Sequence, residues 1–107
     1  MVTIIQGESQ PIYIDLYQDD RILTPDMIQD LTICIGDSFS ASYLAGGVQF
    51  RQETSQWCIW PTKAETQAIT PGKHWIYAHV RYADDSEPIF KLDIISVEKH
   101  RCGGVHL

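Results

Sequence analysis

Apolar and polar residues alternate along most of this chain with a repeat of two. Five segments show the alternation clearly, at residues 12–16, 31–35, 57–60, 74–82 and 89–97. Successive side chains of a β-strand point to opposite faces of a sheet, so this repeat predicts half-buried strands. Weaker alternation indicates two further strands, at Val2–Gln6 and Val48–Gln52.

Turn-forming residues separate these segments at intervals of roughly 8–12 residues, which is typical of a β-sandwich or barrel. They are Gly7–Pro11, Asp19–Arg21, Gly46–Gly47, Pro71–Gly72 and Asp84–Ser86. We interpret Gly46–Gly47 as a hairpin turn that joins Ser40–Leu44 to Val48–Gln52. In the last strand the apolar positions change side, which predicts a β-bulge near Asp93–Ser96.

Two short helical pieces interrupt the strands. Thr62 and Glu65 have the spacing of a capping box, in which each side chain bonds the other residue's backbone N–H. Pro71 limits this helix to about two turns. Thr24 followed by Pro25 predicts a single further turn.

The composition is that of one small globular domain: 107 residues, of which 44% are hydrophobic. Eight Lys and Arg residues against 14 Asp and Glu residues give a formal charge of −6. This balance argues against nucleic acid and anionic membranes as partners. The N-terminal residues lack the basic and apolar regions of a signal peptide, and no apolar run has the length of a membrane span.

The three cysteines are Cys34, Cys58 and Cys102, with no Cys-x-x-Cys pair. We expect free thiols, as in a reducing cytoplasm. Cys34 and Cys58 lie within apolar strands, so we expect both to be buried structural residues. The open alternative is a small cysteine-dependent enzyme, in which His74 or His79 approaches Cys58.

Metal-binding and catalytic patterns are weak. His100, Cys102 and His106 have ligand chemistry, but their spacing fits no standard zinc site. The paired carboxylates Asp19–Asp20 and Asp84–Asp85 both occupy turns, where Asp bonds the nearby backbone. We therefore predict no metal, no cofactor and no catalytic residue.

The chain has more aromatic side chains than a small core needs. The conspicuous group is Trp57, Trp60, Trp75, Tyr77 and Tyr82. In alternating strands some of these side chains must face outward, and outward aromatics are typical of protein–protein interfaces. A flat sugar-binding platform is the alternative.

Four segments, in order along the chain, resemble a family of small structural proteins of phages and prophages of Gram-positive bacteria. They are the opening Val2–Gly7 with Pro11, the strand Ile28–Ile33, the helical turn Pro61–Ile69, and the ending Val97–Glu98 with Gly104–Leu107. The family is in turn similar to the immunoglobulin-like N-terminal domain of phage baseplate upper proteins. Trp57, Trp60, Cys102 and His106 depart from the family's usual residues.

The resemblance implies an all-β, immunoglobulin-like sandwich of about 7–8 strands with one short helical turn at Thr62–Ile69. We expect the sandwich to span residues 1–98, followed by a C-terminal arm at 99–107. The family carries no catalytic residues, so the implied function is that of a non-enzymatic virion protein.

Such a protein would be an accessory or connecting module of the tail, baseplate or capsid, made in the host cytoplasm. It would act by binding copies of itself or other virion proteins. The expected contact residues are Trp60, Trp75, Tyr77, Val105 and Leu107. A carbohydrate-binding or adhesion module with an aromatic face is the alternative function.

Overall fold

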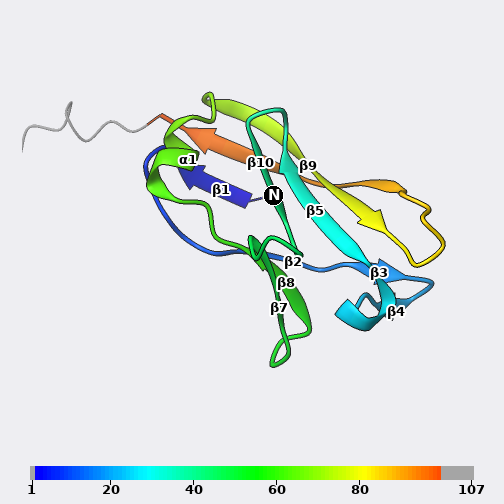
Figure 1. Cartoon of the computed structure of the whole chain (residues 1–107). Helices are drawn as coiled ribbons and strands as arrows, with labels where there is room; N and C mark the ends of the chain where they lie inside the picture. Colours follow the sequence, from blue (N-terminus) through cyan, green and yellow to red (C-terminus); the bar gives the residue numbers. More distant parts are fainter. Residues whose placement is uncertain (1, 100–107) are drawn as a thin grey trace, which may run out of the picture.

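The structure is a computed structural model that describes residues 2–99 (Figure 1). Strands dominate the described residues, and the strand bounds follow the alternating segments closely. The strands are β1 (Val2–Ile5), β2 (Ile12–Ile14), β3 (Tyr17–Gln18), β4 (Arg21–Ile22), β5 (Asp30–Ile35), β6 (Phe39–Ser42), β7 (Val48–Arg51), β8 (Gln56–Ile59), β9 (Gly72–Arg81) and β10 (Ile89–Glu98). A 3-10 turn, η1 (Pro25–Met27), and a short helix, α1 (Lys63–Gln67), complete the described elements.

Two sheets form the body of the molecule. One has the strand order β1-β10-β9-β5-β6, and the other has the order β2-β8-β7, while β3 and β4 form a separate two-stranded ribbon. All pairings are antiparallel except that β1 runs parallel to β10.

This strand order is that of a variable-type immunoglobulin sandwich. In that fold one sheet contains strands C′, C, F and G, and the other contains B, E and D. Here β6, β5, β9 and β10 take the first set of places, and β2, β8 and β7 take the second. The expected all-β, immunoglobulin-like sandwich with about 7–8 strands is confirmed, because five and three strands form the two sheets.

Inward-facing side chains from both sheets make one apolar core. In β5, Leu31, Ile33 and Ile35 are all fully buried, as the two-residue repeat requires. At the centre lies Trp57 of β8, whose ring meets Tyr43 edge-on at 5.4 Å between centroids. Its indole Nε1–H donates to the Leu23 carbonyl oxygen at 2.9 Å. Trp57 therefore ties the segment after the β3–β4 ribbon to the core.

A β-bulge in β10 moves the apolar face of that strand from one side to the other. The pairing of β10 with β9 shifts register between Lys91 and Asp93. Leu92, the extra residue at the shift, is partly buried against the core, and beyond it Ile95 and Val97 are buried. The predicted bulge is confirmed, a residue or so before the expected position.

The helix α1 has the predicted capping box. The Glu65 backbone N–H donates to Thr62 Oγ1 at 3.2 Å, and the Thr62 backbone N–H donates to Glu65 Oε1 at 2.8 Å. The buried Thr66 hydroxyl accepts from the Gly7 N–H and donates to the Glu8 carbonyl. These bonds fix α1 on the loop that leads from β1 to β2.

One turn prediction is wrong. Gly46–Gly47 does not close a hairpin, because β6 pairs with β5 in one sheet and β7 pairs with β8 in the other. The two glycines carry the chain from one sheet to the other. A Cβ atom on Gly47 would lie 2.9 Å from the Ala41 Cβ, so this crossing needs a residue without a side chain.

The other turns are as expected. Asp19 and Asp20, both at positive φ, form the tight turn between β3 and β4. Asp84–Ser86 closes the hairpin between β9 and β10. The predicted arm at 99–107 lies, except for Lys99, outside the described residues.

Candidate interaction surfaces

The residues expected to contact partners lie on two different faces of the sandwich. Trp75 and Tyr77 lie on β9 and face outward from the five-stranded sheet, whereas Trp60 follows β8 of the other sheet. Val105 and Leu107 lie outside the described residues. The structure therefore brings Trp75 and Tyr77 together and separates both from Trp60.

The outer surface of β9, with its neighbours β5 and β10, is called the five-strand face below. Trp75 is 40% exposed, and the Lys91 ammonium lies 4.5 Å above its ring centroid. Tyr77 is half-buried in register between Cys34 of β5 and Lys91 of β10. Ile89, opposite His79, is 59% exposed. This face exposes aromatic side chains, which are enriched in interface cores.

A shallow hollow of about 360 Å³ lies on the same face. Asp30, His79, Arg81 and Glu87 contribute its charged and polar walls. The Arg81 Nε atom is buried, and within residues 2–99 it has no hydrogen-bond partner.

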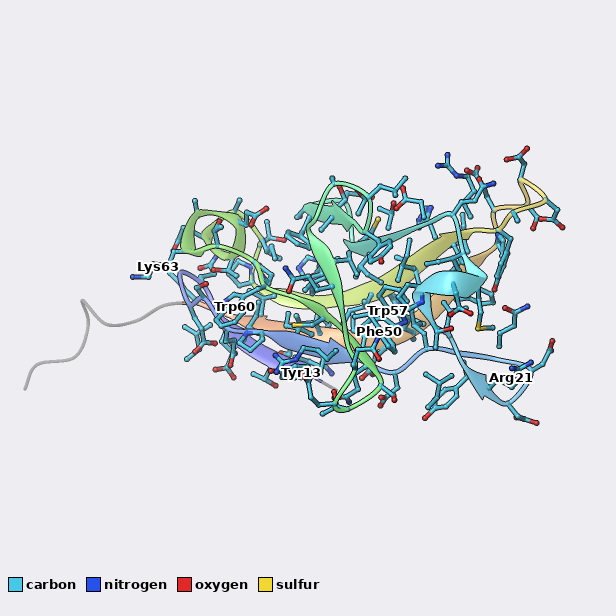
Figure 2. All side chains as sticks on the ribbon, turned by 60° about the horizontal axis from the view of Figure 1, so that its bottom comes forward. Tyr13, Arg21, Phe50, Trp57, Trp60 and Lys63 are labelled. Carbon is cyan, nitrogen blue, oxygen red and sulfur yellow. The ribbon has the colours of Figure 1, made fainter. Side chains whose placement is uncertain are left out.

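The outer surface of β2 and β8, together with Trp60, is called the three-strand face. Tyr13 is 44% exposed and Trp60 is 61% exposed on this face. Both side chains are labelled in Figure 2. The Trp60 indole N–H donates to Ser9 Oγ at 3.1 Å. The Arg51 guanidinium lies 5.7 Å from the Tyr13 ring centroid. Two exposed aromatics with polar neighbours form a second, smaller candidate surface.

A third surface was missed in the sequence. It is an apolar groove of about 280 Å³, called the end groove, between the segment around the β3–β4 ribbon and the start of β10. Its walls are Asp15, Leu16, Tyr17, Leu23, Val80, Tyr82, Phe90, Lys91 and Leu92. Tyr17 is 63% exposed and Phe90 is 41% exposed. The two-residue repeat places Phe90 and Leu92 on one apolar face of their strand. Tyr17 is more than 70 residues away in the sequence, so local patterns do not show that it lines the same groove.

The cysteines have different environments from those expected. Cys58 is buried, as predicted, but Cys34 is only partly buried on the five-strand face. The prediction for Cys34 is wrong because Leu31, Ile33 and Ile35 take the inward positions of β5. Burial raises the pKa of both thiols, and the Arg51 guanidinium partly offsets this effect at Cys58. Neither thiol is thus activated as a thiolate at neutral pH.

The structure does not bring Cys58 together with either histidine considered. Cys58 belongs to the three-stranded sheet, whereas His74 and His79 lie on β9. The His74 ring nitrogen Nε2 is 2.8 Å from the Thr70 carbonyl oxygen. The catalytic pair that the sequence left open is not formed by these residues.

The carboxylate pairs serve turns. Asp84 Oδ1 accepts from the Ser86 backbone N–H at 3.0 Å and from its hydroxyl at 2.6 Å. These hydrogen bonds lower the pKa of Asp84. Over residues 2–99, no three His, Cys, Asp or Glu side chains gather in a way that could hold a metal ion. His100, Cys102 and His106 lie outside that range.

No helix within residues 2–99 is long and apolar enough to cross a membrane. No protein-family model matches the sequence, and the comparison with curated proteins found no significant match.

Proposed function

We propose that this protein is a non-enzymatic structural component of a bacteriophage virion, an accessory or connecting module of the tail, baseplate or capsid. The observation that carries the proposal is the five-strand face, on which Trp75, Tyr77 and Ile89 remain accessible around Lys91. Faces with exposed aromatic side chains are suited to protein partners. The four segments that resemble small phage structural proteins supply the virion context.

The mechanism proposed is assembly through surfaces. Homo-oligomers, contacts with other virion proteins, or both would cover the five-strand face. Trp75 would act as an anchor, since large aromatics at the centre of an interface contribute most to affinity. The net charge of −6 favours a protein that stays dispersed until a matching surface is present.

Two measurements test this function. Mass spectrometry of purified particles from the encoding phage or prophage should detect the chain in a fixed ratio to the major structural proteins. Particle binding should weaken at least 10-fold in Trp75→Ala, as expected for a hot-spot aromatic. Absence of the chain from the particles would overturn the proposal.

A carbohydrate-binding or adhesion module is the second candidate, and the three-strand face favours it. Tyr13 and Trp60 are exposed there on one face. Gln56 Nε2 donates a hydrogen bond to Asp15 Oδ1 at 3.1 Å, and this pair gives the face a polar edge. Calorimetric titration with cell-wall oligosaccharides would support this function if Trp60→Ala alone abolished binding. The matched variant Trp75→Ala should leave sugar binding unchanged.

A further inference from the structure

The outer edge of β10 is covered over only part of its length. β1 pairs with Ile95–Glu98, from Val2 opposite Ile95 to Ile5 opposite Glu98. Among the described residues, no strand pairs with that edge over Ile89–Leu92. An edge with unpaired backbone groups is a ready template for another strand.

The end groove lies beside this free edge. Phe90 and Leu92 of the edge form one wall, and Tyr17 and Leu23 form the other. Apolar side chains line most of the groove between these walls, and carboxylates lie at its rim. Asp15 lines the groove directly, and burial and, to a lesser extent, the charge of Asp19 raise the pKa of Tyr82 in its wall. Lys91 also lines the groove, but its ammonium lies 4.5 Å above the Trp75 ring on the five-strand face.

The sequence contains a segment with complementary features. Residues 1–98 hold all 14 acidic residues of the chain, whereas 99–107 hold none and carry Lys99 and Arg101. Val105 and Leu107 are two positions apart, so in a strand both would point to the same face. Basic residues followed by two same-face apolar residues match an acidic rim around an apolar groove.

Distance favours the groove of a neighbouring copy. The segment leaves from the Glu98 end of β10, and the groove lies at the Ile89 end; Figure 1 places β3 and β4 at the opposite end from α1 and the end of β10. From Phe90 to Glu98 the strand rises about 27 Å, and nine fully extended residues span at most about 30 Å. To reach its own groove, the segment would have to reverse at Lys99 and run almost straight past β1.

We infer that residues 99–107 of one copy dock as an added strand in the end groove of the next copy, along Ile89–Leu92. Val105 and Leu107 fill the groove, and Lys99 and Arg101 face its acidic rim. Because the two contacting surfaces differ, the assembly is head to tail and forms a ring or a filament rather than a symmetric dimer. The inference rests on the proposed assembly function and names its partner.

Sedimentation velocity on the full-length chain over a range of concentrations tests this. The wild-type mass should rise with concentration and fall with salt. The segment variant Val105→Ser/Leu107→Ser should weaken association more than about 10-fold, because two apolar anchors are lost. The groove variant Asp15→Asn/Asp19→Asn removes the carboxylate that lines the groove and the one whose charge acts on Tyr82 in its wall, and it should weaken association roughly 3- to 10-fold. Asn tolerates the positive φ of Asp19, so the tight turn is kept.

Two controls, a charge-matched variant and a mixing experiment, test whether the effects are specific to the groove and the segment. Asp37→Asn/Glu53→Gln removes two exposed charges in loops that do not line the groove, and should leave association unchanged. Phe90→Ser removes an apolar wall of the groove and leaves residues 99–107 unchanged. Mixed with the segment variant, it should give a 1:1 complex that grows no further, because the one intact groove and the one intact segment bind each other and the groove and segment left over are both defective.

The outcomes separate this inference from the assembly proposal. If the segment variant associates as strongly as the wild type, the docking inference is overturned and self-assembly stands. If the wild type stays monomeric up to about 1 mM, the docking inference is also overturned, and mass spectrometry of particles decides the virion role independently. Cooperative urea unfolding of each variant, at a concentration where all are monomeric, shows that each one is folded.

Discussion

Replacement of Trp57 by Phe tests how the β3–β4 region is held to the sandwich. Trp57 is fully buried, and its indole N–H is the donor to the Leu23 carbonyl. Leu23 is also buried and lines the end groove. The substitution removes the donor and leaves a small void between Tyr43 and Phe50, the two rings that pack against Trp57.

The expected cost has two parts. A buried carbonyl without a partner costs about 1–3 kcal/mol. Loss of the remaining indole atoms from a packed core adds about 1 kcal/mol. We therefore expect Trp57→Phe to lower the free energy of unfolding by about 2–4 kcal/mol, a large part of the 5–15 kcal/mol typical of a domain.

Urea unfolding, followed by circular dichroism, measures this change. With a slope of about 2 kcal/mol per molar urea, the midpoint should fall by roughly 1–2 M. The matched control is Trp60→Phe, because Trp60 is 61% exposed and its indole N–H donates to the exposed Ser9 hydroxyl rather than to a core carbonyl. That variant should change stability by no more than about 0.5 kcal/mol. Equal losses in the two variants would refute the assignment of Trp57 as the anchor.

Two further predictions concern titratable groups. In a Cys102→Ser background, Cys34 should react slowly with an aromatic disulfide reagent at pH 7 and Cys58 only on unfolding, since burial raises the pKa of both thiols; comparable fast reaction of both would contradict their burial. The pKa of Asp84 is lowered by Ser86, so its stabilising effect on the β9–β10 hairpin is complete above the unfolded-state pKa and is lost as pH falls through the folded value. Carbon-detected NMR titration should show this midpoint below that of an unstructured Asp, and an ordinary value would refute the role of Ser86.

The fold could largely be predicted from the sequence because one physical signal dominates it. The two-residue repeat places Leu31 and Ile33 inward and Thr32 outward, and the structure follows it. Local capping chemistry located α1 equally well, since Thr62 and Glu65 act within one turn. The resemblance supplied the sandwich topology in advance of any pairing information.

Long-range pairing could not be predicted from local sequence. A Gly-Gly turn has the same sequence whether the next strand pairs with the preceding one or crosses to another sheet. The hairpin predicted at Gly46–Gly47 is wrong for this reason. Which exposed side chains share one surface also depends on long-range pairing. Trp60 and Trp75 are both exposed, but only the topology of the sheets shows that they face different directions.

The parallel pairing of β1 with β10 also has a consequence for how the chain folds. Val2 lies opposite Ile95, so this contact joins residues separated by almost the whole described chain. β1 can therefore find its place only after β10 has been synthesised. Such distant contacts slow folding, because the entropy of closing the loop is lost before the pairing compensates for it. β1 therefore stays without its partner strand while the eight strands between it and β10 are made.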